Sequence, residues 1–261
     1  MILDTLADAA RERTRARQKK ISFAKMRHLA ESLPQKRAGC FQKALQAPGL
    51  HIIAEVKKAS PSKGLIAPFF PYETIAETYE KSGASAISVL TEPTRFLGKY
   101  AYLEAIRRRV KVPILRKDFT VDPYMVYEAR CLGADAVLLI AALLSDRELS
   151  EYRQMAESLG MDALVEAHDE REVTRALKSG AKILGVNNRN LKDFTVDVGN
   201  SLRLRPLVPP EIPFIAESGI HDGAAVKLLA EHGVSGVLIG ELLMRSPSIE
   251  AKMKELLEAA S

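Results

Sequence analysis

The chain has 261 residues, of which 47% are hydrophobic and 27% charged, a composition typical of globular proteins rather than disordered or fibrous ones. No apolar run approaches the about 18 residues of a membrane span, and the first residues lack the order of a signal peptide. Cys40 and Cys131 lie far apart in no metal-ligand spacing. We therefore expect a cytoplasmic protein with no membrane contact, no metal and no cofactor.

The net charge of +5 comes from one segment near the start of the chain. Residues 11–37 carry +8, whereas Asp4 and Asp8 contribute −2, which leaves −1 for residues 38–261. We interpret the segment as the solvated face of a helix. The alternative is a contact with nucleic acid or another anionic surface. Because no aromatic interleaving supports that alternative, we expect no nucleic-acid partner.

Residues 1–47 are predicted to form a helical extension packed on the rest of the chain. Two apolar stripes at helical spacing support it, one from Leu3, Leu6, Ala9 and Ala10, and a weaker one from Ile21, Phe23, Leu29 and Leu33.

From residue 48 onward, a strand followed by a helix is the repeating unit. Apolar, strand-like runs lie near residues 52–56, 86–90, 112–116, 136–140, 162–166, 182–186, 213–217 and 236–240. Helix-like stretches lie at 73–82, 100–109, 123–132, 146–159, 170–179 and 222–232. Glycines that fit helix ends precede five strands, at Gly83, Gly133, Gly160, Gly180 and Gly233. The expected N-cap residues are Asp146, Asp169 and Asp222.

Eight such units predict an α/β protein with a (β/α)8 TIM barrel. A doubly wound open sheet is the alternative, but no Gly-rich dinucleotide turn follows the first strand. We expect residues 1–261 to form a single domain, with residues 1–47 as the extension and residues 48–261 as the barrel.

In a barrel of this type, active residues lie at the C-terminal ends of the strands. Seven of the eight predicted ends are polar, namely Glu55/Lys57, Thr91/Glu92, Arg116/Lys117/Asp118, Glu166/His168, Asn187/Asn188/Arg189, Glu217/Ser218 and Gly240/Glu241. By strand alternation, Glu55, Lys57, Lys117, Glu166 and Asn187 face the same mouth. This set offers an acid, a base and fixed positive charge, and a purely structural ion network is the alternative. We expect His168, two residues past Glu166, to be a surface histidine.

The seventh and eighth strand ends carry a candidate anion site. Ser218 and Gly219 supply a hydroxyl and a bare backbone, and Gly240 precedes a run that can begin a helix with free N–H groups. Loops after these two strands bind phosphate in many barrels. Ordinary loop glycines are the alternative.

Several short motifs together resemble the indole-3-glycerol phosphate synthase family. The similarity covers about residues 50–247, and the helical extension also fits. The motifs are Ala54–Lys57 with Ser60–Gly64, Leu115–Phe119, Leu164–Glu166, Gly185–Leu191, Ile215–Ile220 and Leu238–Glu241. The resemblance implies closure of the indole ring of 1-(2-carboxyphenylamino)-1-deoxyribulose 5-phosphate, with loss of CO2 and water, in tryptophan biosynthesis.

The resemblance also assigns roles. It implies that Lys117 protonates the carbonyl oxygen, that Lys57 with Arg189 holds the carboxylate, and that Glu166 takes part in dehydration. The implied catalytic residues are Glu55, Lys57, Lys117, Glu166, Asn187 and Ser218. The implied substrate-binding residues are Ser60, Phe96, Phe119, Leu138, Arg189, Leu191, Gly219, Gly240 and Glu241. Other family members can carry Ser at position 241, so the Glu241 side chain is not the expected phosphate ligand.

Two rival functions are less consistent with these residues. A phosphosugar isomerase barrel would need a cysteine or aspartate acid–base pair at its strand ends, and Lys57 with Lys117 argue against it. A non-catalytic barrel that binds anions through residues 11–37 would not need the charges of the mouth. We therefore expect a monomeric enzyme that acts on a small phosphorylated substrate.

Overall fold

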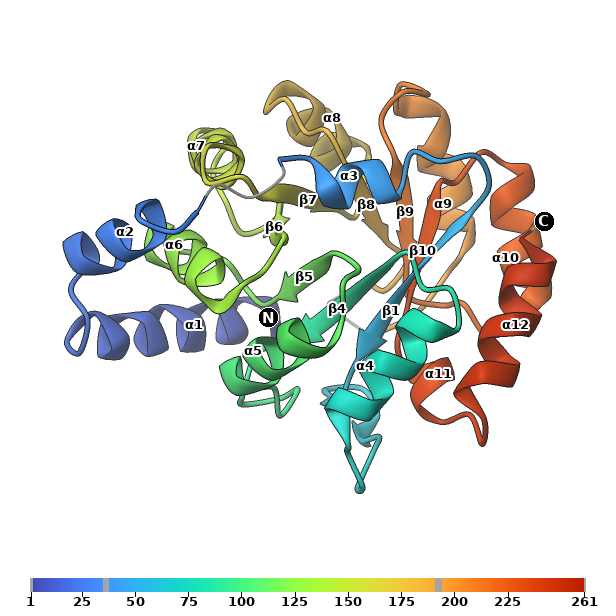
Figure 1. Cartoon of the computed structure of the whole chain (residues 1–261). Coiled ribbons are helices and arrows are strands. Elements are labelled where there is room, and N and C mark those ends of the chain that lie inside the picture. The colour runs from blue at the N-terminus through green and yellow to red at the C-terminus, as the bar shows by residue number, and fades with distance from the viewer. Residues whose placement is uncertain (1, 35–37, 191–193, 261) are drawn as a thin grey trace.

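Eight parallel strands close into a barrel in the computed structural model, which describes residues 2–34, 38–190 and 194–260 (Figure 1). The order around the barrel is β1-β10-β9-β8-β7-β6-β5-β4. The strands are β1 His51–Val56, β4 Ala86–Leu90, β5 Ile114–Lys117, β6 Ala136–Ile140, β7 Asp162–Ala167, β8 Leu184–Asn187, β9 Phe214–Glu217 and β10 Gly236–Ile239. The predicted (β/α)8 barrel is confirmed, although β5 and β8 begin two residues later than expected. A small hairpin of β2 Ala59–Ser60 and β3 Gly64–Leu65 follows β1.

Helices cover the outside of the barrel. They are α4 Tyr72–Lys81, α5 Tyr100–Arg109, α6 Pro123–Leu132, α7 Asp146–Ser158, α8 Glu170–Lys178, α9 Gly199–Leu204, α10 Gly223–Glu231, α11 Glu241–Met244 and α12 Ile249–Ala259, with a 3-10 turn at Arg205–Leu207. The five predicted glycines all have positive φ. Asp169 and Asp222 cap α8 and α10, but the prediction for Asp146 is wrong. Ser145 caps α7, because its hydroxyl and Glu148 form a reciprocal capping box one residue earlier. Helices α9 and α12 were not predicted.

Strand alternation decides what reaches the mouth. In β1, Ile52 and Ala54 pack outward against the helices, whereas Ile53 points into the barrel interior. Leu115 of β5 and Leu164 of β7 point into the same interior. The residues two positions further along these strands are Glu55, Lys117 and Glu166, so each inward row ends in a charged group at the C-terminal end.

The extension consists of α1 Ile2–Gln18, α2 Phe23–Glu31 and α3 Cys40–Ala44 (Figure 1). The first predicted stripe is confirmed at Leu3, Leu6 and Ala10, which are buried. The second is confirmed only in part: Ile21 packs against α2 and α6, but Phe23, Leu29 and Leu33 are each 38% to 42% exposed. Helix α2 instead buries Met26 and Ala30 against Tyr124 and Tyr127 of α6. These two residues are four positions apart on one face, and the small Ala30 allows close approach.

The basic segment is not a uniformly solvated face. Arg13 forms an ion pair with Asp118, and Arg17 forms one with Glu128 of α6. Arg15 on the same helix and Lys19 just after it are exposed. The interpretation as a solvated face therefore holds for part of the segment and is wrong for Arg13 and Arg17, which bind carboxylates of the barrel.

The extension also closes the end of the barrel opposite the mouth. Phe41 and Leu45 are fully buried against the inward rows of the strands. The Asp162 carboxylate at the start of β7 accepts hydrogen bonds from the backbone N–H groups of Phe41 (2.9 Å) and Gln42 (3.1 Å). These bonds satisfy N–H groups of the first turn of α3 and hold the plug in place. Across the ranges that the structure describes, no helix is both long and apolar enough to cross a membrane.

We expect Phe41→Ala to lower the free energy of unfolding by about 3–5 kcal/mol, because it empties a packed site inside the barrel. The matched control is Phe69→Ala, since the Phe69 side chain is 85% exposed and its removal should change stability by less than about 0.5 kcal/mol. Urea denaturation followed by circular dichroism measures both. Equal effects of the two substitutions would show that Phe41 does not plug the barrel.

Candidate active site

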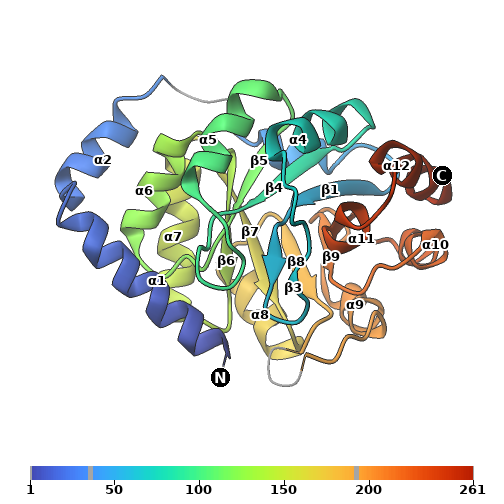
Figure 2. The ribbon, with the colours of Figure 1, turned by 90° about the horizontal axis from the view of Figure 1, so that it is seen from below.

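A cavity of about 790 Å³ opens at the C-terminal ends of the strands. Figure 2 looks toward this end, with the β2–β3 hairpin over the strand ends and α1 along one side. Fourteen of the fifteen predicted site residues line the cavity: Glu55, Lys57, Ser60, Phe96, Lys117, Phe119, Leu138, Glu166, Asn187, Arg189, Ser218, Gly219, Gly240 and Glu241. Leu191, the fifteenth, lies outside the described residues. The five residues that strand alternation placed at one mouth, Glu55, Lys57, Lys117, Glu166 and Asn187, are among them.

The Lys117 ammonium lies at the centre of the mouth, between two carboxylates. Its Nζ is 3.1 Å from Glu166 Oε2 and 3.2 Å from Glu217 Oε2. Burial alone would lower the pKa of Lys117, but Glu166, Glu217 and Glu55 outweigh it and raise that pKa above its usual range. Lys117 is therefore protonated at every physiological pH.

The two carboxylates have different environments, and this separates their pKa values. Burial raises the pKa of Glu217 above its usual range, and the nearby charge of Glu166 adds to the effect although Lys117 opposes it. Burial acts on Glu166 too, but Lys117, His168 and Asn187 together hold its pKa below the usual range. Two neighbouring carboxyls whose pKa values are pushed apart by their environments are typical of acid–base sites.

Glu166 has a set of neighbours that fixes its orientation. Asn187 Nδ2 donates to Glu166 Oε1 at 3.2 Å, and His168 Nε2 lies 3.4 Å from the same oxygen. His168 Nδ1 lies 2.9 Å from Glu172 Oε2. Although burial opposes it, contact with the two carboxylates raises the pKa of His168 to about 10. The expectation of a surface histidine is wrong, because the strand end turns His168 back between Glu166 and Glu172.

Glu217 was missing from the predicted site. Its Oε1 is buried without a hydrogen-bond partner among the described residues, and its side chain is 2% exposed. The sequence did contain the signal. Ile215 points into the barrel interior, so alternation places Glu217 in the same layer as Glu166.

Two glycines leave the space that these carboxylates occupy. A Cβ atom on Gly185 would collide with Glu217 Oε1, and one on Gly240 would lie 2.6 Å from Glu55 Oε1. Glu55 itself forms an ion pair with Lys57. Gly185 and Gly240 therefore make room for acidic side chains as well as for any ligand.

One end of the cavity is built from backbone. Ser218 and Gly219 both have positive φ, 65° and 82°, directly after β9. For Ser218 this conformation is strained, and such strain is common at functional sites. Asn188 Nδ2 fixes the turn by donating to the Ser218 carbonyl oxygen at 3.0 Å. Beside it, α11 begins at Glu241, and the first N–H groups of a helix are free to bind an anion.

Glu241 lies at the rim of this end. Its Oε1 is 3.1 Å from Arg245 Nε and 3.6 Å from Lys63 Nζ of the loop after β1. Both cations offset the negative charge that Glu241 would otherwise direct toward an anionic ligand.

The opposite end is apolar. The rings of Phe96 and Phe119 lie 6.1 Å apart at 44°, and Leu138 is buried beside them. Helix α1 adds Ile2, Leu3 and Leu6 to this lining, which sequence reasoning did not predict. Arg189 is held at the edge, where its backbone N–H donates to Asn187 Oδ1 at 3.0 Å.

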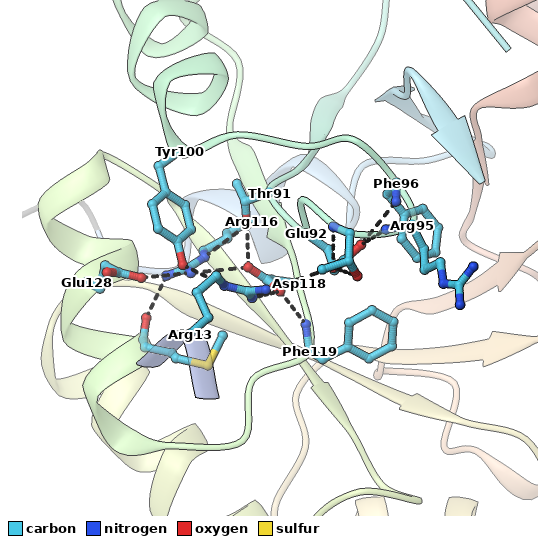
Figure 3. Close-up of polar contacts among 12 residues, drawn as sticks. Arg13, Thr91, Glu92, Arg95, Phe96, Tyr100, Arg116, Asp118, Phe119 and Glu128 are labelled. Atoms are coloured by element: carbon cyan, nitrogen blue, oxygen red, sulfur yellow. Dashed lines mark hydrogen bonds and ion pairs between the residues drawn. The ribbon is translucent and has the colours of Figure 1, made fainter. Parts of the chain in front are cut away.

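Arg116 and Asp118, the neighbours of Lys117 in the sequence, belong to a polar network (Figure 3). Arg116 donates to Glu128 Oε2 at 2.9 Å and to the Met125 carbonyl oxygen at 3.0 Å. Its side chain is 1% exposed, and Glu128 with Asp118 keeps its pKa above the usual range although burial opposes it. These contacts hold the backbone of β5 on both sides of Lys117. The position from which the Lys117 side chain extends is therefore fixed.

The model of the family described as indole-3-glycerol phosphate synthase matches residues 3–256. The chain belongs to the indole-3-glycerol phosphate synthase family. The indole-3-glycerol phosphate synthase of Lacticaseibacillus paracasei is 55% identical over 246 residues, which cover 94% of this chain and 95% of that protein. The one from Ruminiclostridium cellulolyticum is 51% identical over 256 residues, 98% of each chain.

Solved structures of other enzymes share the barrel. The 3-hexulose-6-phosphate synthase of Salmonella typhimurium matches with a TM-score of 0.67 at 13% identity, over 81% of this chain and 98% of that one. The thiamine phosphate pyrophosphorylase of Pyrococcus furiosus matches with a TM-score of 0.59 at 18% identity, over 83% and 96%. At such low identity these likenesses show the fold alone.

We expect His168→Asn to destabilise the protein more at low pH than at high pH. The pKa of His168 is about 10 in the folded protein against an ordinary 6.5, so its stabilising contribution is full below pH 6.5 and is lost as the pH rises through 10. The difference in unfolding free energy between parent and variant should shrink by at least about 1 kcal/mol between pH 6 and pH 9.5.

Urea denaturation at several pH values measures this difference. His28→Asn is the control, because His28 is exposed on α2 and its variant should show no such trend. A pH-independent difference for His168→Asn would contradict the ion pairs that we assign to the imidazolium.

Proposed function

We propose that the chain closes the indole ring of 1-(2-carboxyphenylamino)-1-deoxyribulose 5-phosphate to give indole-3-glycerol phosphate, with release of CO2 and water. The main support for the proposal is the set of groups that line the mouth of the barrel. It combines an ammonium between two carboxylates, a second lysine, an apolar end and a backbone-lined end in one cavity. Family membership points to the same reaction.

The first step needs an acid at the ketone. The ring carbon that bears the carboxylate attacks the ketone carbon, a C–C bond forms, and the carbonyl oxygen becomes an alkoxide. We assign its protonation to Lys117 because Glu166 and Glu217 keep this lysine charged and pointed into the cavity. The raised pKa of Lys117 does not prevent the transfer, since an alkoxide is a stronger base than an amine.

The second step releases CO2 and restores the aromatic ring. The electron pair of the broken C–C bond returns to the ring, so the carboxylate must be held until it leaves. Lys57 and Arg189 line the cavity and supply the positive charge for this. Glu55, paired with Lys57, orients that ammonium.

The third step is dehydration. A base removes a proton from the carbon next to the nitrogen, and the hydroxyl formed in the first step leaves as water after protonation. We assign the base to Glu166, whose pKa stays low, and the acid to Lys57 or Lys117. Asn187 orients Glu166. Glu217, with its raised pKa, limits the negative charge around Lys117.

The phosphate is proposed to bind far from these groups, at Ser218, Gly219 and the N–H groups that follow Gly240. The left-handed turn at Ser218 and Gly219 and the start of α11 support this placement. Phe96, Phe119 and Leu138 are proposed to enclose the aromatic ring, with Ser60 at the loop after β1. Leu191 belongs to the same proposed set.

We further propose that residues 1–47 and 48–261 act as one domain on a small-molecule substrate alone. Phe41 and Leu45 of the extension pack inside the barrel, and Leu3 shares that cluster. Arg13 and Arg17 bind carboxylates of the barrel rather than facing outward, which supports a structural role for these two cations.

The direct test of the function is the appearance of indole fluorescence when the purified chain is mixed with the ribulose substrate. The chain contains no tryptophan, so the product signal has little protein background. Failure to form a product with the indole chromophore, at substrate concentrations up to the millimolar range, would contradict the proposal.

We expect Lys117→Ala to lower kcat by at least about 10²-fold, because the acid at the ketone is lost, with a much smaller change in KM. Lys117→Arg should rescue little, since a guanidinium does not release its proton at neutral pH. Lys57→Ala should raise KM as well as lower kcat, because that lysine is proposed to hold the carboxylate. Steady-state kinetics measures all three. Near-normal kcat in Lys117→Ala, with Lys57→Ala inactive at unchanged KM, would show that the two roles are reversed.

A further inference from the structure

Arg13 connects the extension to two loops at the mouth of the barrel (Figure 3). Its Nη2 donates to Asp118 Oδ1 at 2.7 Å and its Nε donates to the Tyr100 hydroxyl at 3.0 Å. Its Nη1 lies 3.9 Å from Glu92 Oε1, and the side chain is 15% exposed. A single guanidinium thus faces two carboxylates, one after β5 and one after β4.

The Asp118 carboxylate fixes the chain that carries Phe119. Its Oδ1, besides accepting from Arg13, accepts the backbone N–H of Phe119 at 2.9 Å. Its Oδ2 accepts from the Thr91 hydroxyl at 2.7 Å and from Arg116 Nη2 at 3.3 Å. The side chain is fully buried, so Asp118 needs cationic partners to remain there as an anion.

The Glu92 carboxylate does the same for the loop that carries Phe96. Its Oε2 accepts the backbone N–H groups of Arg95 (2.8 Å) and Phe96 (3.0 Å), and its Oε1 accepts the N–H of Thr94 at 2.7 Å. This side chain is also fully buried. The loop therefore folds around a buried charge, and the ion pair with Arg13 offsets that charge.

We propose that Arg13 is a positioning residue that sets the aromatic end of the cavity. It neutralises the two carboxylates that hold the backbones of Phe96 and Phe119, and so it fixes the distance between their rings. Arg13 does not contact the substrate in this account. The inference rests on the proposed function in one respect, namely that these two rings enclose the anthranilate part of the substrate.

The other cation nearby does not replace Arg13. Arg116 also donates to Asp118 Oδ2, but its other contacts are with Glu128 and the Met125 carbonyl oxygen, and none of its contacts among the described residues is with Glu92. Loss of Arg13 therefore leaves Glu92 with a buried charge that lacks its ion pair with Arg13, and we expect the loop to open toward water in response. The hold on the Phe96 backbone then weakens.

The test compares Arg13→Met with Arg11→Met. Both substitutions remove a charge from α1, but Arg11 pairs only with the exposed Asp8 in the contacts that the structure describes. Arg13→Lys is the conservative variant, because it keeps the charge and loses the forked geometry. Asp118→Asn, alone and combined with Arg13→Met, completes a double-mutant cycle.

Calorimetry with two small probes measures ligand binding at each end of the cavity separately, and it does not require turnover. Anthranilate (2-aminobenzoate) probes the aromatic end, and inorganic phosphate probes the other. We expect Arg13→Met to raise the Kd of anthranilate by about tenfold or more, with the Kd of phosphate unchanged within about twofold. Arg13→Lys should fall between parent and Arg13→Met, and Arg11→Met should match the parent.

A tryptophan reporter gives a second readout that does not depend on ligand binding. The chain contains no tryptophan, so Phe96→Trp introduces a single fluorophore at the aromatic wall. We expect its emission to shift to longer wavelength, and its quenching by acrylamide to increase, when Arg13→Met is added. The same addition of Arg11→Met should leave both unchanged.

The proposal is overturned if Arg13→Met weakens anthranilate and phosphate equally, or if its probe affinities and its reporter emission match those of Arg11→Met. Additive effects in the cycle with Asp118→Asn would also overturn it. If Arg13→Met does not fold, Arg13→Lys decides by the same two readouts. If the parent chain forms no indole product while Arg13→Met still shifts the reporter, the proposed function fails and the positioning role stands.

Discussion

The mouth of this barrel depends on one electrostatic arrangement, the Lys117 ammonium between the carboxylates of Glu166 and Glu217. Two buried carboxylates this close would repel each other without the cation, and the cation would lose its charge without them. The result is a lysine that stays protonated and two acids whose pKa values move in opposite directions. The pKa values of the two glutamates therefore differ because their environments differ, although their side chains are chemically identical.

The rest of the structure holds these three groups in place. Strand alternation delivers them to one layer, Asn187 and His168 orient Glu166, and Gly185 leaves space for Glu217. On the outside of β5, a buried network around Arg116 fixes the backbone of Lys117. The N-terminal extension contributes at both ends of the barrel, since Phe41 fills the closed end and α1 lines the open one.

Much of this could be predicted from the sequence, and the reasons for success and failure are physical. Parallel strands buried on both faces are apolar throughout, so the strands can be located from apolar runs in the sequence. A charged residue at a strand end, such as Glu55 or Lys117, is not explained by packing and therefore indicates a functional site. Contacts between distant segments were not predictable in this way. Nothing in the periodicity of α1 distinguishes Arg13 from Arg15, although the first binds Asp118 and the second is exposed. The prediction for His168 was wrong for a similar reason, because its partner Glu172 lies on the following helix.

Lys117, His168 and Asn187 keep Glu166 ionised, whereas burial and the charge of Glu166 raise the pKa of Glu217 although Lys117 opposes them. Carbon-13 NMR of the glutamate side-chain carboxyls, assigned with Glu166→Gln and Glu217→Gln and followed from pH 3 to pH 9, measures this directly. We expect the Glu217 signal to titrate well above the ordinary glutamate range while Glu166 titrates below it. We expect Lys117→Met to raise the pKa of both carboxyls, because the ammonium lies 3.1 Å from Glu166 and 3.2 Å from Glu217. Titration of both carboxyls together near the ordinary value, or unchanged pKa values in Lys117→Met, would contradict this arrangement.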